Sequence, residues 1–331
     1  MKKSIIAGMT ALLLIFVASR ISFTERSEEQ TTGHVEKVAS NQEDLIREQS
    51  IEVKTEENSS EGVSPVIKII TGREASDLHW VERNELLLQL KSKHLSVGDI
   101  LALREFLDEQ PGKEGGNLAF HSLKNDTLQL LIEDGRFSTE LGEKMINYLL
   151  EDDEHQVWRE YVAQFIPQFF GKNLSVHQRL LPEGEKLSKD LLDSLWYVSD
   201  ETEGSVAGTS ILSLIDLSKK GYVEEDKVMQ KAESVALNNS MTSSSRMGAV
   251  FILGKYGNSH QAQNLINLVF DNSSSITLRM SAIQSAGKLS NGDEEFIQRL
   301  EENFINNEIA DKRLKSASLA VIRENQKKQG S

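Results

Sequence analysis

The sequence predicts an all-α fold in which antiparallel helix pairs stack into a solenoid. One indication is an internal repeat: Arg246-Met247-Gly248-Ala249-Val250 recurs as Arg279-Met280-Ser281-Ala282-Ile283, 33 positions later. A fixed period of this size is typical of stacked helical units. The second is the helical spacing of apolar residues from Asp77 onward. The third is the small number of helix breakers, because the chain has only four prolines.

Residues 1–23 are predicted to be an export signal or an N-terminal membrane anchor. Lys2-Lys3 precede an apolar run from Ile5 to Ala18, which is short for a membrane span. Val17-Ala18-Ser19 is an imperfect cleavage site, so a cleaved signal and an uncleaved anchor both remain open. Either one would place the rest of the chain outside the cytoplasm, in the periplasm or cell envelope.

Residues 24–65 are predicted to be a disordered acidic linker. After Phe23 the next aromatic residue is Trp80, and acids such as Glu28-Glu29 and Glu56-Glu57 outnumber the bases. Too little apolar surface is present to offset the entropy of ordering the segment. A flexible tether of this length has a typical reach of roughly 35 Å.

Residues 66–199 are predicted to form the helical N-terminal part of the solenoid. Ser96 and Asp99 mark one helix start, and the spacing from Asp153 to Gln156 resembles a capping box at another. Val66–Thr71 follows a proline and is rich in β-branched residues, so we expect a short edge strand or an extended segment there.

Residues 200–331 are predicted to form the clearest repeats. Residues 201–239 read as a diverged helix pair, and Lys219-Lys220-Gly221 reads as a helix C-terminus followed by glycine. The second helices align less well than the first, because Ile266 matches Ile297 at an offset of 31 rather than 33.

This pattern resembles the HEAT and armadillo class of helical repeat proteins, and HEAT repeats more closely because the units have two helices. The resemblance covers about residues 243–325 and extends more weakly back to about residue 200. It departs from the family in lacking the proline often seen in the first helix and a clear Asp and Arg pairing. The resemblance implies a stack of helices with a partner-binding face, and it carries over no catalytic residues.

Composition excludes several functions. The chain has no cysteine, which rules out disulfides, thiolate metal sites and cysteine nucleophiles. Its net charge of −14 disfavours nucleic acid as a partner. No motif for a metalloprotease, a serine nucleophile or a phosphate loop is present. We therefore expect no catalytic, cofactor-binding or metal-binding residues.

The densest polar group is Glu151-Asp152-Asp153-Glu154-His155. Pairing His155 with two carboxylates would make a metal site, but an acidic helix start is the better interpretation. Three tyrosines, Tyr148, Tyr197 and Tyr256, are candidate partner anchors on a groove. The three tryptophans are expected in the core. Lys312-Arg313 and Lys327-Lys328 are predicted to form one mildly basic tail end, either a solvated last helix turn or a small site for an acidic partner.

The sequence thus predicts a non-enzymatic extracytoplasmic scaffold or adaptor that binds a protein or peptide of the cell envelope. Contact with the membrane is expected only through the N-terminal segment. One alternative is an extracytoplasmic enzyme or small-ligand-binding protein with its site in residues 77–199, because that half shows no visible repeat. A purely structural envelope spacer is a third reading.

Overall fold

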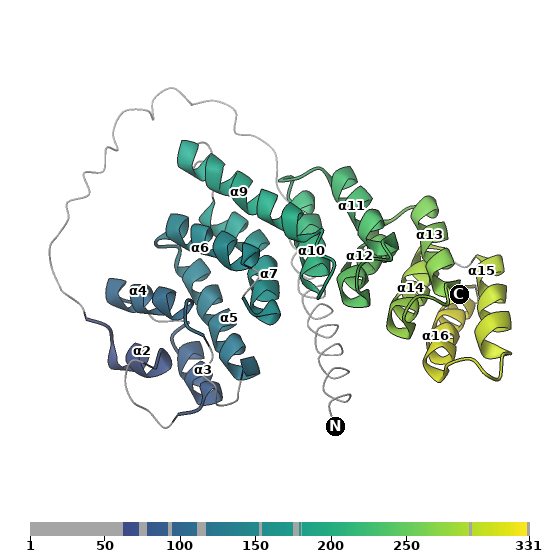
Figure 1. Cartoon of the computed structure of the whole chain (residues 1–331), viewed down its shortest axis with the longest axis horizontal. Helices are drawn as coiled ribbons and strands as arrows, with labels where there is room; N and C mark the ends of the chain where they lie inside the picture. Colours follow the sequence, from purple (N-terminus) through teal and green to yellow (C-terminus); the bar gives the residue numbers. More distant parts are fainter. Residues whose placement is uncertain are drawn as a thin grey trace. The chain divides into compact units, whose positions relative to one another are not determined.

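The computed structural model describes residues 62–72, 78–91, 95–110, 117–151, 154–174, 179, 181–290 and 293–329. Every regular element within these ranges is a helix, which confirms the all-α prediction (Figure 1). No helix in the described ranges is both long and apolar enough to cross a bilayer. The predicted signal or anchor at 1–23 and most of the predicted linker, up to residue 61, lie outside the described residues.

The helices of the first half are Pro65–Ile70 (α2), Trp80–Leu88 (α3), Val97–Phe106 (α4), Asn117–Asp134 (α5), Ser138–Leu150 (α6), Gln156–Asn173 (α7) and Pro182–Val198 (α9). Those of the second half are Val206–Lys219 (α10), Glu225–Leu237 (α11), Ser243–Tyr256 (α12), Ser259–Phe270 (α13), Ile276–Leu289 (α14), Glu294–Leu300 (α15) with a π-helical turn at Glu301–Ile305 (η1), and Lys312–Gln329 (α16).

The expected strand at Val66–Thr71 is wrong, because α2 occupies this segment. Ser64 is the N-cap, and its side chain accepts a hydrogen bond from the amide of Ile67. Pro65 stands at the first helical position, where its fixed φ favours a helix and its missing N–H is not needed. Ile67 and Ile70, one turn apart, are both fully buried. Capping and burial therefore outweigh the β propensity of this short segment.

Other helix ends follow the sequence signals more closely. Ser96 and Asp99 form a reciprocal capping box at the start of α4. The last helical residue of α10 is Lys219, and Gly221 has the positive φ of +78° expected of a glycine after a helix. Helix α7 starts two residues later than a capping box at Asp153 would require. His155 is its N-cap and accepts a hydrogen bond from the amide of Val157.

Four helices, α7, α10, α12 and α14, pack successively side by side and run in the same direction (Figure 1). At their N-terminal ends, Gln156 of α7 donates to the hydroxyl of Ser205 at 3.2 Å. The hydroxyls of Ser243 and Ser275 lie 2.6 Å apart at the starts of α12 and α14. At the C-terminal end of α10, Lys219 lies over the ring of Tyr256, the last residue of α12, at 4.5 Å. Helix α16 packs next, against α14.

An arginine joins each of three helix pairs in the same way. Arg159, Arg246 and Arg279 are each the fourth residue of a helix and donate from Nε to a carbonyl ten positions earlier, at 2.9, 2.8 and 2.9 Å. The acceptors are Leu149, Ala236 and Val269. Each acceptor is the second-to-last residue of the preceding helix, where carbonyls lack helical partners. The three connectors, 151–155, 238–242 and 271–275, have equal lengths, so α6–α7 shares the joint of the later pairs.

Helices α13 and α15 show why the second helices aligned poorly by sequence. They begin at Ser259 and Glu294, an offset of 35 (294 − 259) rather than the 31 of the sequence match. The connector 290–293 is longer than its counterpart 257–258, which accounts for the extra residues. The sequence match had therefore aligned the apolar side chains of α13 with those of the short α15 about one helical turn out of register.

Removing one of the joining arginines is expected to destabilise the fold. Arg246 is 5% exposed, and burial lowers the pKa of its guanidinium. Arg246→Ala should lower the free energy of unfolding by about 2 kcal/mol, because the Ala236 carbonyl loses a charged donor. Arg246→Lys should recover little, since an ammonium cannot place a donor where Nε lies. Urea unfolding measures both, with the exposed Arg323→Ala as control. Equal losses for Arg323→Ala and Arg246→Ala would contradict this role.

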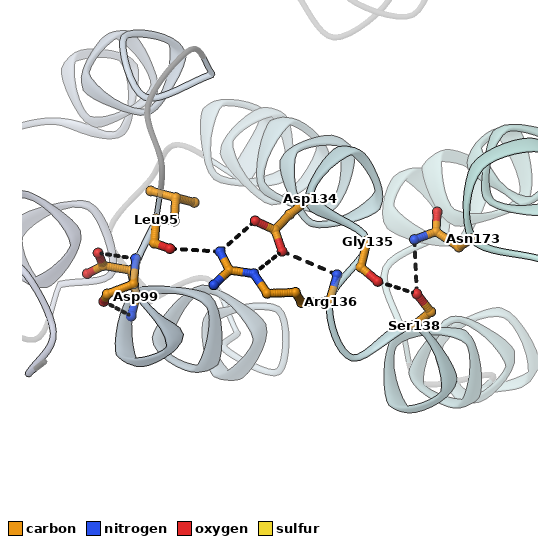
Figure 2. Close-up of polar contacts among 8 residues, drawn as sticks. Leu95, Asp99, Asp134, Gly135, Arg136, Ser138 and Asn173 are labelled. Atoms are coloured by element: carbon orange, nitrogen blue, oxygen red, sulfur yellow. Dashed lines mark hydrogen bonds and ion pairs between the residues drawn. The ribbon is translucent and has the colours of Figure 1, made fainter. Parts of the chain in front are cut away.

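The turn between α5 and α6 is fixed by Arg136 (Figure 2). Arg136 donates to both carboxylate oxygens of Asp134, at 2.6 and 2.7 Å, and to the carbonyl of Leu95 at 2.7 Å. Hydrogen bonding to Asp134 raises the pKa of this guanidinium. Gly135 and Phe137 both have positive φ, +77° and +58°. For Phe137 this is a strained conformation, and the Arg136 contacts help to hold it.

Candidate functional site

The densest buried polar cluster lies where α4, α5, α6 and α7 meet, inside the region that the sequence alternative had singled out. It contains a buried lysine, Lys124, and a buried histidine, His121, both on α5. The turn after α4 adds Asp108 and Glu109, and α6 adds Lys144 and Tyr148. The start of α7 adds Glu154, His155 and Trp158. We call this group the Lys124 cluster.

Lys124 is only 1% exposed and sits among aromatic rings. Its ammonium lies 4.5 Å from the ring centroid of Trp158, 5.6 Å from Tyr148 and 5.8 Å from Phe120. Such rings attract a cation. The ammonium also donates to the carbonyl of Glu109 at 3.3 Å. Burial lowers the pKa of Lys124 to about 8, although the carboxylates of Glu154, Asp108 and Glu109 oppose that shift. The side chain is therefore mostly protonated at neutral pH.

Asp108 connects the cluster to α6. Its carboxylate accepts hydrogen bonds from Lys144, at 2.6 and 2.5 Å, and from the hydroxyl of Tyr148. Burial and the hydrogen bond to Asp108 raise the pKa of Tyr148 far above its usual value, so this phenol remains protonated. The carboxylate therefore holds Tyr148 in place against Trp158, whose ring centroid is 5.5 Å away.

His121 is the buried histidine of the cluster and packs beneath the ring of His155. The two imidazole rings are stacked with centroids 4.3 Å apart, and His121 is 1% exposed whereas His155 is exposed. Burial, together with the nearby His155 and Lys124, lowers the pKa of His121 to about 4. Neither ring nitrogen of His121 has a hydrogen-bond partner among the described residues. The imidazole is therefore neutral at pH 7.

The cluster has acid–base groups, of which Asp108, Glu109 and His155 are exposed, but solvent barely reaches Lys124 and His121. A lysine with a pKa of about 8 can serve as a nucleophile or base once its proton is lost. Lys124, Phe120 and Trp158 are each at most 1% exposed. A substrate could reach the Lys124 ammonium only if the elements that enclose it moved apart.

The candidate partner anchors are placed differently from one another. Tyr197 on α9 is 69% exposed. Tyr256 is half-buried between the ammonium groups of Lys219 and Lys255. Tyr148 is 5% exposed and belongs to the Lys124 cluster, so it is not offered to a partner. The three tyrosines therefore do not form one patch.

The remaining residues singled out in the sequence, which are the acidic group around His155, the tryptophans and the basic pairs, do not come together in one site. No group of three metal-ligating side chains occurs in the part of the chain that the structure describes. Asp152 and Asp153 lie outside that part. Trp158 is fully buried as predicted, whereas Trp80 and Trp196 are partly buried against the core. Lys312-Arg313 and Lys327-Lys328 lie at opposite ends of the 18-residue α16.

Sequence patterns had assigned no functional role to Lys124, His121 or Asp108. A signal was present, because Phe120, Lys124 and Leu128 recur at four-residue spacing on α5. A lysine on an apolar stripe usually extends its ammonium to solvent, so the pattern alone would not have indicated burial. Comparisons with protein-family models, with curated proteins and with solved structures found no match to this chain.

Proposed function

We propose that this chain is a non-enzymatic, extracytoplasmic scaffold built as a HEAT-like α-solenoid that binds a protein or peptide partner. The observation that carries the proposal is the parallel series α7, α10, α12 and α14, in which each helix packs on the next. Stacks of this kind present extended surfaces on which partners dock. The shared arginine joints at α6–α7, α11–α12 and α13–α14 support repeated units from residue 138 onward.

The partner surface can be tested with a photoreactive phenylalanine analogue at Tyr197, the most exposed of the three candidate anchors. A control chain carries the analogue at Ile309, which is 93% exposed. We expect one adduct of defined mass at position 197 in the cell envelope fraction and none at 309. Excess unlabelled chain should compete for that adduct, and Tyr197→Ala chain should not. A further chain carries the analogue at Tyr256. If neither position 197 nor position 256 gives an adduct that unlabelled chain can compete away, the structural spacer is favoured.

Localisation is part of the same proposal and rests on residues 1–23. The chain is proposed to be exported, with this segment either cleaved or kept as the membrane tether. Deleting residues 2–23 should move the chain, and with it the Tyr197 adduct, out of the envelope fraction. An unchanged distribution would argue against export through this segment.

The alternative, an enzyme or small-ligand-binding protein, is favoured by one observation, the buried Lys124 with its lowered pKa. Acetylation of lysines in the folded chain by acetic anhydride distinguishes the two functions. The scaffold proposal expects Lys124 to react far more slowly than Lys189, whose side chain is 75% exposed. Rapid acetylation of Lys124 would show that solvent reaches the cluster and would support the alternative.

A further inference from the structure

An open groove lies beside the Lys124 cluster, between the start of α7 and the loop that precedes α10. Glu154, Gln156 and Arg159 form one side, and the loop from Asp200 to Gly204 forms the other. We call it the α7–α10 groove. The sequence had placed residues 201–204 within a diverged helix pair, but they form a loop, because α10 begins only at Val206.

The groove carries an excess of negative charge. Four carboxylates line it, those of Glu154, Asp200, Glu201 and Glu203, against the single guanidinium of Arg159. Arg159 pairs with Glu201, and Lys231 from outside the groove lies 2.5 Å from Asp200. Glu203 is exposed and forms no ion pair within the described ranges. Glu203 therefore leaves the groove with uncompensated charge, and the charge of Glu154 is offset only by the electrostatic attraction of Lys124.

Glu154 supplies a second and independent observation. Its side chain lines the groove although the residue is only 9% exposed. Gln110 donates to Oε1 at 3.4 Å, but Oε2 has no hydrogen-bond partner in the described part of the chain. Lys124 attracts this carboxylate electrostatically, but its ammonium donates to the Glu109 carbonyl. A shielded carboxylate oxygen without a donor is unfavourable, and a cationic donor from outside would satisfy it.

The rim of the groove is fixed by α12. The amide of Thr242 donates to the carbonyl of Thr202 at 2.8 Å, and the hydroxyl of Ser245 donates to the carbonyl of Gly204 at 2.7 Å. Gly204 has a φ of +74°, and a Cβ there would meet the side chain of Gln156 at 2.0 Å. The loop is thus already held in place, and a ligand would not have to order it.

We propose that the α7–α10 groove binds a basic segment of a protein partner, whose Lys or Arg side chain reaches Glu154 and Glu203. This inference rests on the proposed scaffold function and names the chemistry of the partner. The charge of the groove matches a cation, and the Glu154 and Glu203 side chains line the groove together. Steering by the acidic surface would also speed association with a basic partner.

The test uses the full chain and a fluorescent peptide of alternating lysine and glycine, followed by fluorescence anisotropy. Peptides of the same length with serine or glutamate in place of lysine are the probe controls. We expect the lysine peptide alone to bind, and binding to weaken on raising the salt to about 0.15 M, where charges are screened beyond roughly 8 Å. Asp200→Asn with Glu203→Gln should weaken binding on the order of tenfold, as expected for about 1.4 kcal/mol.

The matched control is Glu302→Gln with Glu308→Gln, which removes the same charge from exposed positions away from the groove. Glu154→Gln is the second test variant, with its fold checked by circular dichroism, and should also weaken binding. Equal weakening by the control pair would indicate general charge attraction and overturn the inference, as would lack of binding by the lysine peptide. If spermine at an equal concentration of charge displaces the lysine peptide, the proposal that the groove selects a basic protein segment would be overturned. None of these failures touches the Tyr197 adduct, which tests the scaffold function separately.

Discussion

Gly248→Ala is expected to lower the free energy of unfolding by about 3 kcal/mol, the upper part of the usual range for overpacking. Gly248 on α12 faces Gly208 on α10, and a Cβ at position 248 would lie 2.4 Å from the Gly208 carbonyl oxygen. The obstacle is backbone, which no rotamer change can move away. The two parallel helices would have to separate, and apolar contact along their interface would be lost.

The control for this prediction is Gly171→Ala in α7, where nothing lies within 4 Å of the added Cβ. In an open helical position alanine is favoured over glycine by roughly 0.5–1 kcal/mol, so this variant should be slightly stabilised. Urea unfolding of both variants gives the comparison. Stabilisation by Gly248→Ala as well would mean that α10 and α12 do not approach as closely as the structure has them.

Acidification is expected to destabilise the protein through His121. The pKa of this imidazole is about 4 in the folded chain and 6.5 when unperturbed. Between these values the unfolded chain binds a proton that the folded chain does not, so the free energy of unfolding falls as the pH drops from about 6.5 to about 4. The loss through this residue is at most about 3.5 kcal/mol, since the two pKa values lie about 2.5 apart and one pKa unit corresponds to about 1.4 kcal/mol. Charging His121 would also set it against Lys124 and His155.

His121→Phe isolates this contribution, because phenylalanine keeps an aromatic ring beneath His155 but cannot titrate. Urea unfolding at pH 7 and pH 4.5 should show a smaller acid loss for the variant than for the native chain. Asp99, whose pKa is lowered from 3.8, loses its stabilising contribution mainly below pH 4 and therefore adds little between pH 7 and pH 4.5. Replacing the exposed His260 with glutamine is the matched control and should leave the acid loss unchanged. If His121→Phe loses as much free energy of unfolding between pH 7 and pH 4.5 as the native chain, His121 is not a cause of the acid destabilisation.

Much of the helical architecture could be predicted from local signals. Ser96 with Asp99 predicted the start of α4, and Lys219 to Gly221 predicted the end of α10, because capping depends on residues close in sequence. The Arg246 and Arg279 repeat marked α12 and α14 before the role of the arginines was apparent. Arg159 escaped notice because the sequence around it does not repeat, although its hydrogen bond to a helix end is the same. The strand prediction at Val66–Thr71 was wrong because it relied on β propensity and ignored the helix start signal of Ser64 and Pro65.

The polar cluster was only partly predictable. Glu151 to His155 stood out as charged residues adjacent in sequence, and His155 proved to be a helix cap. Lys124, His121 and Asp108 come from separate elements, and their burial depends on how α5 packs against α7. The same limit applies to Tyr148, whose burial follows from Asp108 and Trp158. Sequence spacing carries no information on such contacts between distant segments.

The stacking of neighbouring helices has a consequence for how the molecule unfolds. Substantial packing among the described helices joins elements no more than three places apart in chain order, so α3 and α16 share no direct contact. The proposed solenoid would behave as a one-dimensional array of coupled units, whose cooperativity is set by its weakest interface. A single interface such as α10–α12 can therefore divide the melting transition into two. The calorimetric enthalpy would then exceed the van't Hoff enthalpy. The two halves of the chain would unfold in separate heat-absorption peaks.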